Sequence, residues 1–360
     1  MRIDRISTLH DFDAERDRWE RLERQDPHAT VFTSWRWLRA YLPVGRYRWE
    51  VLALREGDEA LAYLPLAHCG NVFDRELCLA GNPHADYTGM IALERSAPRA
   101  VDAFARELLA RRWDGFNVED VRDPRVEALV ERLVAAGMRL ELTVEHTGRS
   151  CALPADWETY VTERISAKTR VNTLRVERRL AEALPGFRIT RITDPGADVE
   201  AHIEAMVLTN HARWGGNLRK ARRRYGGLFR AAHALGILRL VVYWDGTRPI
   251  AGAAAFADHL HASFGLYMLG MDKAYDAYSP GKGIVGRAIR TAIEEGFAHF
   301  DFLRGDEPFK ARYAPDLHTR HSYRLVRPGW RAAAIARVRP LYDQLKLRAA
   351  TVVYGEGRSL

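Results

Sequence analysis

Two stretches in the C-terminal half of the chain carry residues that could act together on one substrate. The first, Tyr278-Ser279-Pro280-Gly281-Lys282-Gly283, opens an apolar run from Ile284 to Ile293 that predicts a helix. Glycines at a helix start expose backbone N–H groups, and the helix dipole favours an anion there. The second, from Phe300 to Lys310, predicts a short strand that runs into a charged loop. Together they predict a phosphate-binding helix end beside acidic and basic side chains, as a nucleotide thioester and an amine would need.

The charged loop supplies the candidate catalytic residues. An amine with a reference pKa near ~10.4 is protonated at neutral pH, so a base must help it attack a thioester. Asp306 and Glu307 are the candidate bases because they follow the strand directly. Arg304, Lys310 and Tyr313 are candidates to bind an anionic acceptor or to protonate the leaving thiolate. The alternative is a structural cluster of ion pairs that ties this loop to the sheet.

These residues resemble a known family. The string YSPGKG followed by FDFLRGDEPFK resembles the CelD-like (BioF2-like) branch of the GNAT acyltransferases, which is related to the Fem-type peptidyltransferases. The resemblance covers Ala155 to Tyr323 and, more weakly, FTSWRWLRAYLP in the N-terminal half. It implies an acyl-CoA donor whose pyrophosphate lies on Ser279 to Gly283 and whose pantetheine arm follows Phe264 to Gly270, which adds Met268 and Gly270 as cofactor contacts. Many members have Gln or Arg where Ser279 stands, so we expect backbone groups to hold the phosphate.

Composition limits the class of protein. The chain has 360 residues, of which 47% are hydrophobic and 28% charged, as in folded soluble proteins. The longest apolar run, Ile250 to Ala257, is far shorter than the ~20 residues of a membrane span. Three cysteines without a CxxC pair and an N-terminus unlike a signal peptide favour the reducing cytosol. We therefore expect a cytoplasmic protein, with the inner membrane surface as an alternative location.

Basic residues concentrate in two stretches, within a net charge of +8. Either stretch could be a solvated helix face, or a patch for the phosphates of coenzyme A, tRNA or a lipid head group. The residues are Arg164, Lys168, Arg170, Arg175, Arg178 and Arg179 in the first stretch, and Arg213, Arg219, Lys220, Arg222, Arg223, Arg224 and Arg230 in the second.

The two halves of the sequence repeat one plan. Val51 to Leu66 and Val241 to Phe256 each read as strand, Gly-containing turn and strand. In each half a helix, a Gly-Phe pair and a further strand follow, which predicts an internal duplication. The first copy has Arg95-Ser96-Ala97-Pro98-Arg99 where the second has its glycine loop, so we expect one cofactor site, in the second copy.

The expected fold is α/β (α+β), with tandem GNAT-like units of mixed sheets flanked by helices. The predicted domains are residues 1–150, a GNAT-like unit without a cofactor loop; residues 151–330, the catalytic unit; and residues 331–360, a C-terminal helix. Between the units, Trp157 to Leu184 reads as helical with Asp156 as its N-cap, and Asp198 to Trp214 reads as a second helix. A helix is also expected from Ala332 to Val353.

Residues outside the loop could shape the acceptor site. The turn-rich segment with Asn82, His84, Asp86 and Tyr87 could line an acceptor cleft, although an ordinary loop would read the same way. Trp214, beside two glycines, is a further candidate to line that pocket.

The sequence thus predicts an acyltransferase that uses acetyl-CoA or another acyl-CoA and no metal. The resemblance implies an amine acceptor, such as an amino sugar or a lipid-linked amine of a cell-envelope or exopolysaccharide pathway. Two alternatives remain: a Fem-type transferase that takes an aminoacyl group from tRNA, and a non-catalytic scaffold. His259 and His261 lack a third ligand at zinc spacing, and the chain has no G-x-S-x-G, Walker or dinucleotide motif.

Overall fold

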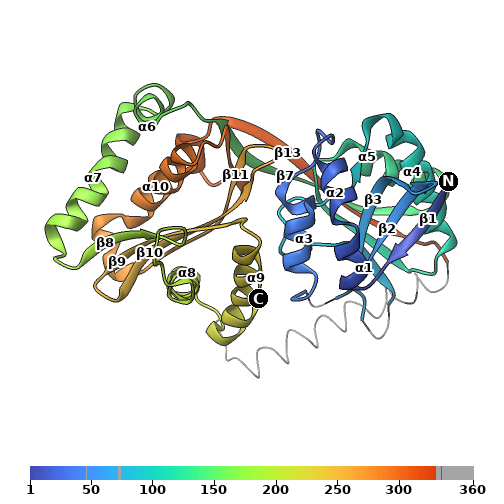
Figure 1. Ribbon diagram of the computed structural model, residues 1–360, viewed down its shortest axis with the longest axis horizontal. Helices are drawn as coiled ribbons and strands as arrows, with labels where there is room; N and C mark the ends of the chain where they lie inside the picture. Colours follow the sequence, from blue (N-terminus) through green and yellow to red (C-terminus); the bar gives the residue numbers. More distant parts are fainter. Residues whose placement is uncertain (46, 72–73, 330–333, 335–360) are drawn as a thin grey trace. The chain divides into compact units, whose positions relative to one another are not determined.

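The computed structural model describes residues 1–45, 47–71, 74–329 and 334 (Figure 1). They form two compact units. Unit 1 comprises Met1–Trp35, Gly45–Glu145 and the described residues from Arg320 onward, and unit 2 comprises Arg36–Val44 and His146–Thr319. Compared with the expected division at residues 150 and 330, residues 36–44 and 146–150 join the second unit and residues 320–329 join the first. The expected C-terminal helix lies outside the described residues, apart from Ala334.

Unit 1 is built on a sheet with the strand order β1-β2-β3-β4-β6-β13, and β5 pairs with β3. Neighbouring strands are antiparallel except β4 and β6, which are parallel. The strands are β1 (Arg2–Ile6), β2 (Arg48–Glu56), β3 (Glu59–His68), β4 (Glu76–Leu79), β5 (Ile91–Ala92), β6 (Gly115–Val121) and β13 (Asp316–Val326). The helices of the N-terminal half are α1 (Leu9–Ala14), α2 (Arg16–Glu23), α3 (Trp35–Tyr41), α4 (Ala97–Ala110) and α5 (Pro124–Ala135).

Unit 2 repeats this arrangement with the strand order β8-β9-β10-β11-β12-β7. Its strands are β7 (Arg139–Ala152), β8 (Phe187–Arg191), β9 (Leu238–Asp245), β10 (Arg248–Asp258), β11 (Ser263–Met271) and β12 (His299–Arg304). Its helices are α6 (Trp157–Thr159), α7 (Ala167–Ala183), α8 (Val199–Trp214), α9 (Leu218–Ala234) and α10 (Pro280–Glu294). Helices α7 and α10 cover one face of the sheet, and α8 packs on the opposite face (Figure 1).

The duplication predicted from the sequence is confirmed by the element order. Strands β1 to β4, helix α4 and strand β6 correspond to β8 to β11, α10 and β12, and both units have their parallel strand pair at the same step. The last strand of each sheet comes from the other half of the sequence. β7 follows α5 but pairs with β12, whereas β13 follows β12 but pairs with β6. This exchange explains why the units do not follow the simple division of the chain.

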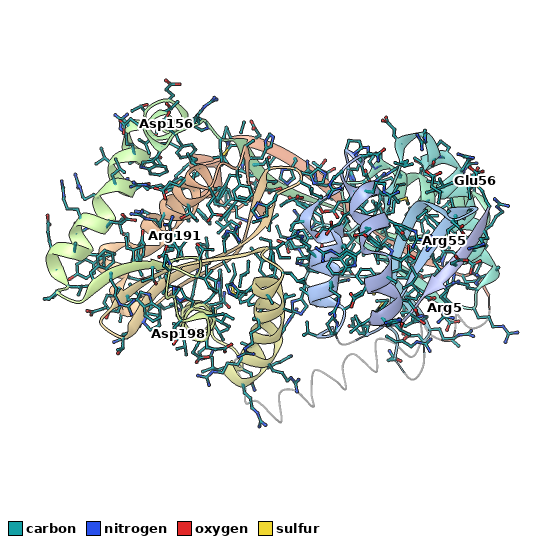
Figure 2. The ribbon with its side chains drawn as sticks, in the orientation of Figure 1. Arg5, Arg55, Glu56, Asp156, Arg191 and Asp198 are labelled. Atoms are coloured by element: carbon teal, nitrogen blue, oxygen red, sulfur yellow. The ribbon has the colours of Figure 1, made fainter. Side chains whose placement is uncertain are left out.

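The N-cap predicted at Asp156 is present, and Asp198, the first residue of the second predicted helix, also caps its helix. Asp156 accepts a hydrogen bond from the backbone N–H of Thr159 at 2.8 Å, and Asp198 accepts one from that of Ala201 at 3.0 Å (Figure 2). Both carboxylates also lie at the positive ends of helix dipoles. Gly215, with φ 74°, ends α8 as predicted.

The continuous helical stretch predicted from Trp157 to Leu184 is wrong. After α6 and a π-helical turn, the backbone becomes extended at Ile165 and α7 begins afresh at Ala167. The Ser166 side chain accepts a hydrogen bond from the backbone N–H of Thr169 at 3.2 Å, so it caps a new helix. Local hydrogen bonding of this kind competes with helix continuation, and here it creates a second helix N-terminus in unit 2.

Helices α7 and α10 approach each other closely because small residues of α10 face α7. A Cβ atom on Gly283 would lie 2.6 Å from Cγ1 of Val176, and one on Gly286 would collide with Thr173. Glu177 of α7 also accepts hydrogen bonds from the Tyr243 hydroxyl at 2.5 Å and from Nε of Arg287 at 2.9 Å. Burial and the nearby Glu177 carboxylate raise the pKa of Tyr243 well above its ordinary value, so this hydroxyl stays a donor. Strand β9, α7 and α10 are thereby held in one arrangement.

No described helix is long and apolar enough to cross a membrane.

The close packing predicts opposite outcomes for two glycine substitutions. Gly283→Ala should lower the free energy of unfolding, because overpacking costs about 1–3 kcal/mol and exceeds the ~0.5–1 kcal/mol gained by replacing a helical glycine. Gly226→Ala in α9 is the matched control, since its Cβ would meet only the end of the Arg230 side chain, at 3.3 Å. Urea denaturation followed by circular dichroism should show a lower midpoint for the first variant and an equal or higher one for the second. Equal effects would contradict the packing argument.

Candidate active site

Strands β11 and β12 part after a short parallel pairing. Ser263, Phe264 and Gly265 of β11 pair with His299, Phe300 and Asp301 of β12. Beyond this point β11 continues to Met271 without pairing with β12, whereas β12 keeps its pairing with β7 on its other side as far as Arg304. A gap therefore opens in the sheet, where backbone groups of β11 face a ligand position in place of a neighbouring strand.

A bulge in β11 changes which of its side chains face each side of the sheet near this gap. The β10–β11 register shifts so that Ala254 and Ala255 lie opposite Met268 and Leu266, which leaves Tyr267 as the extra residue. Tyr267 packs against Phe256, whereas Leu269 and Met271 pack against the core beneath α7 and α10.

The predicted glycine loop begins α10. Ser279 adopts a left-handed conformation, with φ 55° and ψ 49°, and Pro280 occupies the first helical turn. The first N–H groups of a helix have no carbonyl partner within the helix, and the dipole makes this end attractive to an anion. Gly281 places no side chain over these groups. Phosphate contact through the backbone, as expected from the sequence, is compatible with this geometry.

A cavity of about 550 Å³ lies where these parts meet. Its volume is within the usual range for small-molecule sites. The N-termini of both α7 and α10 reach it, together with the end of β11 and the segment after β12. Its lining residues all belong to unit 2: Ser166, Lys168, Thr169, Asn172, Arg213, Leu269, Met271, Asp276, Ser279, Gly281, Lys282, Val285, Phe309, Arg312 and Tyr313.

The cavity is electropositive. Its lining includes four cationic side chains, Lys168, Arg213, Lys282 and Arg312, against one carboxylate, Asp276. The positive ends of two helix dipoles add to this field. The cavity can therefore hold a polyanionic ligand such as a nucleotide pyrophosphate.

The two predicted bases are engaged in ion pairs. Asp306 lies 2.5 Å from Nε of Arg149, which also donates a hydrogen bond to the carbonyl of Pro315. Glu307 lies 2.8 Å from Nζ of Lys310. Burial alone would raise the pKa of Glu307, but its contact with Lys310 outweighs burial and lowers the pKa. Neither acid is among the lining residues of the cavity, so this arrangement favours the structural alternative, and their catalytic role stays a prediction.

Two more loop residues have defined positions. Lys310 is buried, and its ammonium group donates hydrogen bonds to the carbonyls of Phe302, Arg304 and Gly305, so it ties the loop to the end of β12. Arg304 is exposed at the end of that strand.

Tyr313 does reach the cavity. Its hydroxyl lies 3.0 Å from Oγ1 of Thr173 and 3.4 Å from the carbonyl oxygen of Lys282. Burial raises the pKa of Tyr313, although the Thr173 hydrogen bond and the charge of Arg312 oppose the shift. The hydroxyl is therefore protonated at neutral pH and can donate a proton.

Some predicted cofactor contacts have packing roles. A Cβ atom on Gly270 would lie 2.5 Å from Oγ1 of Thr209, so this glycine lets α8 approach β11. Gly283 likewise lets α7 approach α10, so helix packing requires a glycine at this position whether or not a ligand binds. Met268 is buried. Gly281, Lys282 and Ser279 are the predicted contacts that line the cavity.

The predicted acceptor residues are spread over both units. Trp214 is 67% exposed at the end of α8, beneath the guanidinium of Arg213. Asp86 and Tyr87 are buried within unit 1, where Tyr87 packs edge-on against Phe32 and beneath Arg122.

Sequence reasoning named Lys168 among basic residues that could bind phosphate, but it missed the other α7 residues at the cavity. Ser166, Thr169 and Asn172 line the cavity only because the helix restarts at Ala167. Ser166 was the available signal, since serine is a favoured N-cap residue. Among the described residues, no group of three or more His, Cys, Asp or Glu side chains could hold a metal ion.

The Arg149–Asp306 ion pair predicts energetic coupling between these residues. Asp306→Asn and Arg149→Gln should each lower the free energy of unfolding. The loss in the double variant should be smaller than the sum of the two single losses, by about 0.5–1 kcal/mol. A double-mutant cycle by urea denaturation measures this difference. Strictly additive losses would show that the pair does not anchor the loop.

Comparisons with known proteins agree with this geometry. A family model described as "Acetyltransferase (GNAT) domain" matches residues 167–311, from the start of α7 to the segment after β12. A comparison with curated proteins finds no match.

Several solved structures share the fold over nearly the whole chain. FemX superposes with a TM-score of 0.64 at 11% identity, covering 94% of this chain and 99% of its own. A tandem GNAT protein from the clavulanic acid biosynthesis pathway gives a TM-score of 0.56 at 11% identity, with 91% and 100% covered. The C-terminal domain of a putative lysylphosphatidylglycerol synthetase from Agrobacterium fabrum gives 0.53 at 13% identity, with 97% and 100% covered. At these identities the likeness establishes the fold.

The parted strands and the helix N-terminus at the cavity agree with the match of residues 167–311 to a GNAT acetyltransferase domain, and the chain has a tandem GNAT-like fold similar to that of FemX.

Proposed function

We propose that this protein is an acyl-CoA-dependent N-acyltransferase, most simply an N-acetyltransferase, that acts on an amine. The observation that carries the proposal is the open N-terminus of α10 at an electropositive cavity where β11 and β12 have parted. The pyrophosphate of coenzyme A would lie on the N–H groups near Gly281, with Lys282 beside it. The pantetheine arm would extend along β11 past Met271 and Leu269.

The proposed reaction transfers the acyl group directly. The amine nitrogen attacks the thioester carbonyl carbon, the C–S bond breaks, and an amide and coenzyme A form. Backbone N–H groups of β11 beyond Gly265 would stabilise the oxyanion. The amine loses a proton to water or to a base, and the Tyr313 hydroxyl is the proposed proton donor to the thiolate. Proximity within the cavity supplies much of the rate enhancement.

The acceptor proposed is an amine on a sugar or on a cell-envelope or exopolysaccharide precursor, modified in the cytoplasm. This part rests on the sequence resemblance. Proteins of comparable fold are named for a putative lysylphosphatidylglycerol synthetase and for the clavulanic acid biosynthesis pathway, so the fold alone does not choose the acceptor.

One observation favours a second candidate, transfer of an aminoacyl group from tRNA. Arg219, Lys220 and Arg223 of α9 are exposed, and among the described residues they have no acidic partner within ion-pair distance. Such a basic face could contact a phosphate backbone. The fold likeness to FemX is compatible with this alternative. Gly281 lines the cavity at the start of α10, and this position favours a nucleotide thioester as the donor. The same position argues against a non-catalytic scaffold that has lost its ligand.

A charge reversal at the α10 N-terminus tests the donor site. Gly281→Asp should abolish binding of acetyl-CoA, because its carboxylate would occupy the pyrophosphate position. The fold should persist, since Asp is favourable in the first turn of a helix and its Cβ would meet only the movable Met271 side chain.

The matched control is Ala97→Asp in the first turn of α4, the corresponding helix of unit 1. It should bind acetyl-CoA normally by isothermal calorimetry. Normal binding by both variants would place the donor elsewhere.

The two donors predict different binding behaviour. Acetyl-CoA should raise the melting temperature by mass action, with a stabilisation of about 2.7 kcal/mol at a concentration of 100 Kd. Binding of aminoacyl-tRNA would instead weaken steeply with salt as counterions are released. A thermal-shift titration with both ligands separates them: no shift with acetyl-CoA, together with salt-sensitive tRNA binding, would replace the first proposal with the second.

A further inference from the structure

Arg213 is a cation that reaches the cavity and has no ion-pair partner in the part of the chain that the structure describes. It lies in the last turn of α8, is half-buried and lines the cavity. Among the described residues no carboxylate lies within 4 Å of its guanidinium. Burial lowers the pKa of Arg213, and the charge of Glu307 opposes that shift. Since Glu307 is itself paired with Lys310 at 2.8 Å, the guanidinium keeps its capacity to bind another anion.

Arg213 enters the cavity from the side opposite to the helix end proposed for the pyrophosphate. Helix α8 packs on the face of the sheet opposite to α7 and α10, with Met206 and Thr209 against Gly252 and Gly270. The α10 N-terminus and Arg213 therefore approach the cavity from different sides of β11. A ligand group on Arg213 would lie across the gap from the pyrophosphate, where a second substrate would enter.

The neighbouring Trp214 orients this guanidinium. The Arg213 Cζ atom lies 4.7 Å from the centre of the Trp214 ring, a cation–π contact. Trp214 remains 67% exposed, so its position is not explained by burial in the core. The α8 C-terminus also favours a cation. The planar Arg213 guanidinium, held in this way, can donate two parallel hydrogen bonds to the two oxygens of a carboxylate or phosphate.

We propose that Arg213, positioned by Trp214, binds an anionic group of the acceptor. The acceptor of the proposed acyl transfer is then an amine that also carries a carboxylate or a phosphate. This inference rests on the proposed function, because the acceptor role of the far side follows from the donor position at α10.

The test measures anion binding directly, with coenzyme A present to occupy the donor site. Inorganic phosphate and malonate are titrated separately into coenzyme A-saturated protein by isothermal calorimetry. At least one anion should bind, and Arg213→Gln should weaken that binding by about 10- to 100-fold, as expected for loss of hydrogen bonds to a charged group. The affinity for coenzyme A should stay unchanged. Binding of phosphate alone would indicate a phosphorylated acceptor, and binding of malonate alone a carboxylate.

Two further variants serve as controls. Arg219→Gln removes an exposed charge of the same basic stretch that does not line the cavity, and it should leave anion binding unchanged. Trp214→Ala should weaken anion binding less than Arg213→Gln, and Trp214→Phe, which keeps an aromatic face, should restore it.

The inference is overturned if neither anion binds the unaltered protein, if Arg213→Gln binds anions as well as the unaltered protein, or if that variant weakens coenzyme A itself. The last outcome would assign Arg213 to the donor phosphates. Absence of coenzyme A binding by the unaltered protein would contradict the proposed function, and the same anion titrations without coenzyme A would still report on Arg213.

Discussion

The close contact between α7 and α10 is the constraint on which the candidate site depends. Gly283 and Gly286 let the two helices approach, and Glu177 joins them through Arg287. Because these contacts hold the helices together, two helix N-termini border one cavity, where their dipoles would act on the same ligand. A bulkier side chain at Gly283 would separate them, so a packing requirement in the core fixes the electrostatics of the site.

The parted strands supply the other half of the site, and only one of the two units completes it. Both units have a parallel strand pair followed in the sheet by an exchanged strand, yet α4 begins Ala97-Pro98 where α10 begins Pro280-Gly281. Gly281 has no side chain that could cover the backbone N–H groups at the start of α10. The duplication therefore provides a shared framework, and a few residues decide which copy can hold a nucleotide.

Local signals in the sequence predicted several of the elements. The Gly57 and Gly246 turns, the Asp156 cap and the extent of the helix from Asp198 to Trp214 all depend on neighbouring residues, so the sequence alone revealed them. The strand exchange and the cavity depend on contacts between distant segments. The ion pair of Asp306 with Arg149, 157 residues away, could not be read from the charged loop itself. Nor could the packing role of Gly283, because its partner Val176 lies on another helix.

The measurement that tests the central claim most directly is hydrogen–deuterium exchange of the full chain with and without coenzyme A. A donor site at α10 predicts slower exchange of the amides from Ser279 to Ile284 and of β11 from Leu266 to Met271. The amides from Arg95 to Arg99, at the corresponding helix start of unit 1, should exchange at an unchanged rate. Protection at Arg95 to Arg99, or no protection at α10 under saturating coenzyme A, would contradict a donor site in unit 2.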